Sequence, residues 1–492
     1  MFESAELGHR IDKETYRKEV APLREALLDT QLDLLESRNC PVIVLIAGMD
    51  GAGKGETVNK INEWMDPRHI DTYVFGPPSD EEAERPPMWR YWRTLPPKGK
   101  IGIYFGSWYT DPILKSADGK LENEALEEAL ERIVRFEQML IDEGALVLKY
   151  WFHLSKEKQK ERMKKLENDP LTRWRITDQD RKHLKIYDEL KTVAEGVLRE
   201  TSTAGAPWIV VESFDANYRN LTVGKHIQQA IRERLDEKPA RSSTLNAPPL
   251  KVAIDSTNLL SQLDLTKRIE DKEYDKKLER YQAKLNKLTR DPKFTKMSVI
   301  CVFEGADAAG KGGCIRRITE AVDARFFRVI PIAAPSEEER TQPYLWRFWR
   351  HIPRLGNVTI FDRSWYGRVL VERVENFCSE YDWMRAYGEI NDFEEQLALH
   401  NFLVVKFWLQ ISKEEQLQRF EARQNTPYKR FKITKEDWRN RDKWEAYEAA
   451  ACDMIDRTST DSAPWTVVEA NDKNFARIKV LKTLCERVEK AL

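Results

Sequence analysis

The stretch Gly305-Ala306-Asp307-Ala308-Ala309-Gly310-Lys311-Gly312-Gly313 follows a run of apolar, mostly β-branched residues at 299–303. A short apolar run of this kind predicts a buried strand. The glycines after it allow the backbone to turn so that consecutive N–H groups face one point. A helix that begins near Lys311 adds the positive end of its dipole at the same point. A strand, a glycine loop ending in lysine, and a helix together predict a phosphate-binding loop of the Walker A type.

The loop departs from the usual Walker A pattern at one position. Gly312 follows the lysine, where a Ser or Thr normally supplies a hydroxyl to Mg²⁺. Carboxylates are the obvious replacement, and two of them are suitably placed. Asp307 lies inside the loop, and Asp362 ends the apolar run 358–361, where a Walker B carboxylate belongs. We therefore predict Asp307 and Asp362 as ligands of Mg²⁺; the alternative for Asp307 is a cap of the following helix.

The loop motif occurs twice in the chain. An earlier copy reads Gly48-Met49-Asp50-Gly51-Ala52-Gly53-Lys54-Gly55, and the two lysines differ by 311 − 54 = 257 positions. Three further landmarks recur at this offset: Trp89–Arg93 with Trp346–Arg350, Ser107–Tyr109 with Ser364–Tyr366, and Ala206–Trp208 with Ala463–Trp465. A fixed offset over so many landmarks predicts two copies of one domain with almost no insertions between the landmarks.

The domain boundary is predicted from a cluster of Pro and Ser residues. Lys238-Pro239, Ser242-Ser243 and Pro248-Pro249 fall between the copies. We therefore expect one domain at 1–236, a linker at 237–249 and a second domain at 250–492. Each copy holds about 235 residues, a normal size for one α/β domain.

Within each copy, helical patterns alternate with short apolar runs. The expected helices include 16–36 and 274–288, and the expected strands include 42–47, 299–303, 358–361, 403–409 and 465–468. Alternation of this kind predicts a parallel sheet with helices on both faces. In such sheets the ligand binds at the carboxyl ends of the strands.

The composition narrows the class of protein. The 492 residues include 81 Lys and Arg against 82 Asp and Glu, a formal net charge of −1, which argues against a basic nucleic-acid coat. At 41% hydrophobic residues, the chain has enough apolar material for folded cores. No apolar run approaches the roughly 18 residues of a membrane span, and the first residues lack a signal-peptide core. We expect a cytoplasmic protein without a membrane or nucleic-acid partner, and we expect Cys301 to be a small buried hydrophobe.

The second loop, together with Asp362-Arg363-Ser364-Trp365-Tyr366, resembles the polyphosphate kinase 2 family. That family carries an Asp in its Walker A loop, and its Walker B motif reads Asp-Arg-Ser followed by aromatic residues. The resemblance covers nearly the whole chain, twice over. It implies two tandem P-loop kinase-like domains with the thymidylate-kinase-like three-layer α/β/α fold, each with a parallel sheet and a helical lid. Single-domain relatives are oligomers, so the fusion resembles a covalently joined pair, and a homodimer of this chain stays open as a further assembly.

The resemblance also implies a reaction. Fused two-domain members resemble polyphosphate:AMP phosphotransferases, which transfer the terminal phosphoryl group of inorganic polyphosphate to AMP and form ADP, reversibly and with Mg²⁺. By this resemblance, Asp307 and Asp362 serve the metal and the attacking phosphate, Lys311 serves the transferring phosphoryl group, and Arg363 offsets its charge. The alternatives are polyphosphate-dependent phosphorylation of ADP or GDP, an ATP-dependent nucleotide kinase, and a regulatory module that only binds phosphate.

Further residues are predicted to bind phosphate or nucleotide, because transfer chemistry needs cations around the phosphates. A basic segment from Arg419 to Arg441, interrupted at Pro427, is predicted as a lid that excludes water; the alternative is a charged helix exposed to solvent. Glu372 has an ion pair on a helix face as its alternative. The predicted binding residues are Gly305, Ala308, Ala309, Gly310, Gly312, Gly313, Arg368, Glu372, Arg423 and Arg430.

The two copies differ at the predicted site. The first copy keeps Asp50, Gly53 and Lys54 of the loop. At the offset of 257, however, five site residues are replaced: Asp362 by Phe105, Arg363 by Gly106, Arg368 by Asp111, Glu372 by Lys115 and Arg423 by Leu166. A Phe cannot hold Mg²⁺, and an Asp in place of an Arg reverses the local charge. We therefore predict that the second copy is active and that the first has a degenerate site.

Overall fold

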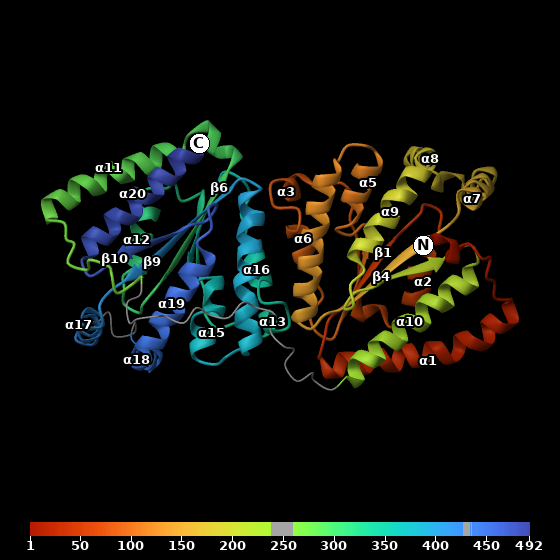
Figure 1. Cartoon of the computed structure of the whole chain (residues 1–492), viewed down its shortest axis with the longest axis horizontal. Coiled ribbons are helices and arrows are strands. Elements are labelled where there is room, and N and C mark those ends of the chain that lie inside the picture. Colours follow the sequence, from red (N-terminus) through yellow and green to blue (C-terminus); the bar gives the residue numbers. More distant parts are fainter. Residues whose placement is uncertain (238–258, 427–432, 434) are drawn as a thin grey trace. The chain divides into compact units, whose positions relative to one another are not determined.

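The computed structural model describes residues 1–237, 259–426, 433 and 435–492 (Figure 1). The predicted linker at 237–249, apart from Glu237, lies outside the described residues, as do Pro427 and Arg430. The chain divides into two compact units, each built largely from one copy of the repeat. Two short segments are exceptions, since Ser79–Trp89 is grouped with the second unit and Pro335–Trp346 with the first.

Each unit contains a five-stranded sheet whose strands are all parallel. The order is β2-β3-β1-β4-β5 in the first and β7-β8-β6-β9-β10 in the second. The strands are β1 (Val42–Gly48), β2 (Ile70–Val74), β3 (Ile101–Phe105), β4 (Leu146–His153), β5 (Trp208–Glu212), β6 (Ser298–Gly305), β7 (Phe327–Pro331), β8 (Val358–Asp362), β9 (Phe402–Gln410) and β10 (Trp465–Glu469). The register repeats too, because Val42 pairs with Ile101 just as Val299, 257 positions later, pairs with Val358.

Helices cover both faces of each sheet. In the first copy they are α1 (Lys13–Ser37), α2 (Lys54–Trp64), α3 (Asp80–Ala83), α4 (Trp89–Trp92), α5 (Thr110–Ala117), α6 (Asn123–Asp142), α7 (Lys156–Asn168), α8 (Asp178–Lys185), α9 (Tyr187–Thr201) and α10 (Ala216–Asp236). In the second they are α11 (Asp271–Thr289), α12 (Lys311–Thr319), α13 (Glu337–Arg340), α14 (Trp346–Trp349), α15 (Val371–Val374), α16 (Glu380–Ala398), α17 (Lys413–Gln424), α18 (Lys435–Asp442), α19 (Trp444–Thr458) and α20 (Lys473–Ala491). In the second unit, α11, α12 and α20 pack together on one face, and α16 and α19 cover the other (Figure 1).

The predicted fold class is confirmed: both copies are three-layer α/β/α domains with parallel sheets. The edge strands β2 and β7 had not been predicted. Their residues are mostly exposed or half-buried, so they lack the apolar run by which the central strands are recognised in the sequence.

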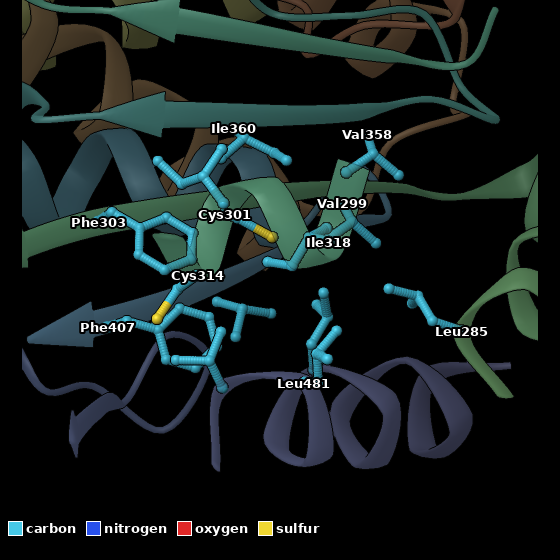
Figure 2. Packing of buried hydrophobic residues seen from close by; sticks show 14 of the residues in the cluster. Leu285, Val299, Cys301, Phe303, Cys314, Ile318, Val358, Ile360, Phe407 and Leu481 are labelled. Carbon is cyan, nitrogen blue, oxygen red and sulfur yellow. The ribbon is translucent and has the colours of Figure 1, made fainter. Parts of the chain in front are cut away.

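The core of the second unit lies between β6 and the helices α12 and α20. Alternate residues of β6, namely Val299, Cys301 and Phe303, share one face of the sheet and pack with Ile318 and Leu481 (Figure 2). Cys301 is fully buried, which confirms its prediction as a small hydrophobe, and burial raises the pKa of its thiol to about 12. This packing fixes the position of the loop that follows β6.

All six cysteines of the chain are free thiols. Within the described residues, none of the helices is both long and apolar enough to cross a membrane.

Candidate active site

The phosphate loop of the second copy starts where β6 ends. Gly305 has φ +140°, and a Cβ at this position would lie 2.4 Å from the carbonyl oxygen of Leu409, so only glycine fits. Ala308 also has a positive φ, of 62°, which is uncommon for a residue with a side chain. Gly310, at φ +108°, caps the N-terminus of α12, and Lys311 is the first helical residue. The predicted sequence of strand, loop and helix is therefore present.

Lys311 folds back over the start of its own loop. Its Nζ donates to the carbonyl oxygens of Gly305 at 2.7 Å and Ala306 at 3.3 Å. Burial lowers the pKa of Lys311, and the nearby Arg363 cation lowers it further. The ammonium group thus lies at the mouth of the loop, where it can bind a phosphate oxygen.

Asp307 connects the loop to two other segments. One carboxylate oxygen accepts from Arg363 Nη2 at 2.8 Å, and the other accepts from Asn440 Nδ2 at 2.8 Å. The side chain of Asp307 is 11% exposed. The Walker A loop, the turn after β8 and helix α18 therefore meet at this one carboxylate. Asn440 is not among the site residues predicted from the sequence.

Asp362 and Arg363 lie beside the loop because β8 is the neighbour of β6. In the sheet register, Asp362 pairs with Phe303, two residues before Gly305. Arg363 has φ +64°, a backbone strain of about 1–3 kcal/mol for a residue other than glycine. Burial alone would lower the pKa of Arg363, but the carboxylates around it, chiefly Asp307 and Glu304, outweigh burial and raise it. The guanidinium is therefore held as a cation at the strand ends.

A further site residue, Glu304, was missed by the sequence analysis. Its carboxylate accepts from the hydroxyl of Ser364 at 2.8 Å, and burial raises its pKa. Glu304 therefore lies between the phosphate loop and the turn that carries Arg363. Comparison of the copies at the offset of 257 could have found it, since the first copy has Ala47 at this position.

The donor set at the strand ends suits a hard divalent cation. Asp307 lies in the phosphate loop and Asp362 ends the neighbouring strand β8, and Mg²⁺-type sites commonly use one or two carboxylates together with substrate phosphates. The residues present therefore fit a divalent metal.

Comparison with known proteins shows the family of the chain. The family model described as Polyphosphate kinase 2 (PPK2) matches residues 10–239 and again 268–492. The chain belongs to the polyphosphate kinase 2 family. Two relatives named polyphosphate:AMP phosphotransferase, from Pseudomonas aeruginosa and Pseudomonas syringae pv. tomato, are 55% and 52% identical, each over 100% of this chain and 99% of the relative. A crystal structure of a Pseudomonas aeruginosa PA01 protein described as polyphosphate kinase 2 superposes with a TM-score of 0.89 at 53% identity, over 100% of this chain and 99% of that one.

The remaining residues predicted for a polyphosphate kinase 2 site lie on two segments. Arg368 and Glu372 pair with each other, with Nε and Oε2 3.0 Å apart and both side chains largely buried. Arg423 lies on α17, where burial lowers its pKa. Arg430 lies outside the described residues. Their binding roles remain predictions, although the contact with Arg368 matches the alternative of an ion pair for Glu372.

Two arginines of the predicted lid bind backbone rather than face solvent. Arg419 donates to the carbonyl oxygens of Ala308 and Ala309 in the phosphate loop, and Arg441 donates to the carbonyl oxygen of Lys413 at 2.6 Å. For these two residues, the alternative of a charged helix exposed to solvent is therefore wrong. Their positive charge is evident from the sequence, but the sequence does not indicate that they bind carbonyl oxygens of distant segments.

The first copy of this polyphosphate kinase 2 pair keeps the loop but not the cation and carboxylate beside it. Lys54 donates to the carbonyl oxygens of Gly48 and Met49, as Lys311 does in its loop. His183 takes the place of Asn440, with its Nδ1 2.6 Å from Asp50. Burial alone would raise the pKa of Asp50, but the His183 contact and Lys54 outweigh burial and lower it. Phe105 and Gly106 stand where Asp362 and Arg363 stand in the second copy.

The Arg368–Glu372 pair has a counterpart of opposite sign. In the first copy, Asp111 and Lys115 form an ion pair at 2.8 Å on α5, with side chains 69% and 56% exposed. The second-copy pair is 14% and 23% exposed. The interaction is kept while its charges are exchanged between the two positions.

Both copies share a buried polar network behind the site. In the second copy, Lys406 Nζ donates to Glu394 at 2.6 Å and to the hydroxyl of Tyr366 at 2.8 Å, and Glu394 also accepts from Trp365. The first copy repeats the ion pair between Lys149 and Glu137 at 2.7 Å. In each pair both side chains are at most 1% exposed. The network fixes the aromatic residues that follow Arg363, and its presence in both copies indicates a structural role.

Proposed function

We propose that the chain transfers the terminal phosphoryl group of inorganic polyphosphate to AMP with the help of Mg²⁺, and that the second copy carries the reaction. An oxygen of the AMP phosphate forms the new P–O bond, the anhydride bond of the donor breaks, and a shortened polyphosphate leaves. AMP as the phosphoryl acceptor is supported by the names of the full-length relatives, polyphosphate:AMP phosphotransferase. The site is supported above all by the contact between Asp307 and Arg363, which joins the two phosphate motifs.

The residues of the second copy account for the charge and position that phosphoryl transfer needs. The loop N–H groups, the start of α12 and Lys311 bind the transferring phosphoryl group. Arg363 lies beside them and offsets the charge that spreads over the phosphoryl oxygens in the transition state. Asp307 and Asp362 would hold Mg²⁺, which would supply positive charge to offset that of the substrate phosphates.

Helix α18 closes the site from the lid side. Asn440 donates to Asp307 from this helix, and Gln416 on α17 donates to the carbonyl oxygen of Asp307. Both lid helices are thus attached to the loop at one residue. A lid held in this way excludes water, which otherwise competes with AMP for the phosphoryl group.

The first copy is proposed to have lost catalysis, because Phe105 and Gly106 supply neither a metal ligand nor a cation. Paired substitutions test this assignment. We expect Lys311→Ala to lower kcat by about 10³-fold, since it removes a cation from the transferring phosphoryl group, and Lys54→Ala to leave kcat within about twofold. Equal losses in the two variants would contradict the assignment to the second copy.

The substrate assignment is tested with purified full-length protein. Polyphosphate is supplied with AMP, ADP or GDP in separate reactions, and ATP with AMP in a fourth, each product being followed by chromatography. ADP formed from polyphosphate and AMP, at a higher rate than triphosphates from ADP or GDP, is the expected result. Turnover only with ATP would indicate a nucleotide kinase, and binding of polyphosphate without any product would indicate a regulatory module.

A further inference from the structure

Arg419 of α17 is a buried arginine whose donors are all occupied. A guanidinium group carries five N–H donors. In Arg419, Nε donates to Glu415 at 2.6 Å, Nη1 to the carbonyl oxygens of Ala308 and Ala309 at 2.9 and 3.0 Å, and Nη2 to those of Ala470 and Asn471 at 2.7 and 2.8 Å. Its side chain is only 6% exposed. Five donors with five protein acceptors leave none for a phosphate oxygen.

Two of these acceptors belong to the phosphate loop, and their geometry has a consequence for the loop N–H groups. In a planar trans peptide the C=O of one residue and the N–H of the next point in opposite directions. No peptide bond among the described residues is cis. The carbonyl of Ala309 points at Arg419, so the N–H of Gly310 points away from it. By fixing the carbonyls of Ala308 and Ala309, Arg419 therefore sets the direction in which this part of the loop presents its donors.

The other two carbonyl oxygens that accept from Arg419 follow the last strand of the sheet. Ala470 and Asn471 directly follow β10, at the carboxyl end of that strand. The guanidinium thus ties the loop to the far strand of the sheet, whereas the Glu304–Ser364 contact ties the segment before the loop to β8 on the opposite side. Together these contacts fix the loop from two directions.

The first copy places a buried guanidinium behind its loop from another helix. Arg162, at the position of Arg419, pairs instead with Glu56 at 2.9 Å and is 26% exposed. Arg219 of α10 is fully buried, and a Cβ on Gly53 would lie 2.3 Å from its guanidinium carbon. Arg219 donates to Thr57 and to the carbonyl oxygen of Ser213. Its hydrogen bonds thus run to α2 and the end of β5, whereas Arg419 holds carbonyls of the loop itself.

We propose that Arg419 is a positioning residue for phosphoryl transfer, which orients the phosphate loop of the second copy and does not bind phosphate. This inference rests on the proposed function of the second copy. It also assigns different roles to two arginines one helical turn apart on α17: Arg419 holds the loop, whereas Arg423 is the phosphate-binding candidate.

Kinetics of full-length variants provide the first test. Arg419→Ala is expected to lower kcat about 10²-fold, because a small displacement of positioning groups has an effect of this size, while KM for polyphosphate changes less than about threefold. Millimolar methylguanidinium is expected to restore at least tenfold of the lost kcat by filling the vacated site. Arg423→Ala is the matched comparison, with a raised KM for polyphosphate and no such rescue. A raised KM without rescue in Arg419→Ala would overturn the proposal.

A second measurement does not depend on turnover. Amide hydrogen exchange of a peptide covering the loop is compared between wild type and Arg419→Lys, which keeps the charge but has three donors instead of five. Faster exchange confined to the loop is expected, because the Ala309 N–H donates to the carbonyl oxygen of Ala306 within the loop that Arg419 holds. Unchanged exchange in a folded variant would overturn the proposal. If the wild type makes no ADP but the loop loosens in the variant, the proposed function fails, whereas the part of the proposal in which Arg419 orients the loop stands.

Arg219→Ala provides the control for a purely structural effect, since it removes the equivalent buried guanidinium from the first copy. It is expected to lower the urea midpoint while kcat stays within about twofold and methylguanidinium has no effect on the rate. If Arg419→Ala does not fold, Arg419→Lys carries the kinetic test, with an expected loss of about tenfold in kcat. Wild-type kcat in a folded Arg419→Lys would contradict the proposal.

Discussion

The turns after β3 and β8 have nearly the same backbone but different residues. Arg363 has φ +64° in the second copy, and Gly106 has φ +68° at the corresponding position of the first. The same holds in the phosphate loop, where Ala308 at φ +62° corresponds to Gly51 at +73°. In both places the copy with the complete site keeps a strained residue, and the copy without it has glycine, for which this conformation is unstrained.

A strained backbone conformation is thus tolerated where a side chain is needed. Strain of about 1–3 kcal/mol persists only when the surroundings fix the conformation, and it concentrates at functional sites. In the first copy there is also no space for a side chain at Gly106, because a Cβ there would lie 2.4 Å from the carbonyl oxygen of Phe75. The turn of the first copy can therefore no longer accept the arginine.

Exchanging these residues gives the largest expected effect. Arg363→Gly, which installs the first-copy residue, should lower kcat by about 10³-fold or more, because it removes a cation that offsets the charge on the phosphoryl oxygens. Its free energy of unfolding should stay within about 1 kcal/mol of wild type, since relief of strain offsets the lost ion pair with Asp307. Steady-state kinetics and urea denaturation measure the two quantities.

Gly106→Arg is the reciprocal variant. It should leave kcat within about twofold but destabilise the first unit by more than the roughly 1–3 kcal/mol of backbone strain, because of the contact with Phe75. If Arg363→Gly were as active as wild type, Arg363 would have no role in transfer.

The buried lysines should behave alike in the two copies, in contrast to the site residues. Lys406→Met and Lys149→Met each leave a buried glutamate without its partner, which costs about 3–5 kcal/mol in unfolding free energy. Replacing both members, as in Lys406→Met with Glu394→Leu, should recover most of this loss. Denaturant unfolding measures both. A loss in one copy alone would show that the network serves the active site rather than the fold.

The smallest effect concerns pH. Burial lowers the pKa of His153 in the first copy below its ordinary value near 6.5, and the second copy has Gln410 at this position. The unfolded chain then binds more protons than the folded one, so stability is lost as the pH falls from about 6.5 toward the folded pKa, with a slope of at most about 1.4 kcal/mol per pH unit.

His153→Gln should remove this dependence. Urea midpoints of wild type and variant at pH 7.5 and pH 5.5 isolate the contribution of this histidine, because the other groups titrate in both proteins. Equal loss of stability on acidification would show that His153 is not responsible.

Much of the fold and the centre of the site follow from the sequence. The loop glycines, Lys311 and Asp307 were predicted from local pattern, and the parallel sheet from the alternation of strands and helices, because both signals are carried by neighbouring residues. The edge strands escaped prediction since their exposed residues form no apolar run.

Other site contacts depend on chain segments far apart in the sequence. Asn440 reaches Asp307 across 133 positions, and Arg419 reaches Ala308 across 111. The residues next to an asparagine or arginine in the sequence do not indicate to which distant oxygen its side chain will donate. Glu304 is different, because its replacement by Ala47 in the first copy is a signal visible in the sequence alone.

The ion pair whose charges are exchanged between the copies bears on how the two copies diverged after duplication. Passing from Arg368 and Glu372 to Asp111 and Lys115 by single substitutions goes through a like-charged intermediate. On an exposed helix, such an intermediate costs only a few tenths of a kcal/mol, so the path is open. The Lys–Glu pairs at the core have no such path, because any intermediate leaves a buried charge alone. The pair that differs between the copies is thus exposed in one of them, whereas the pair that both copies share is buried in both.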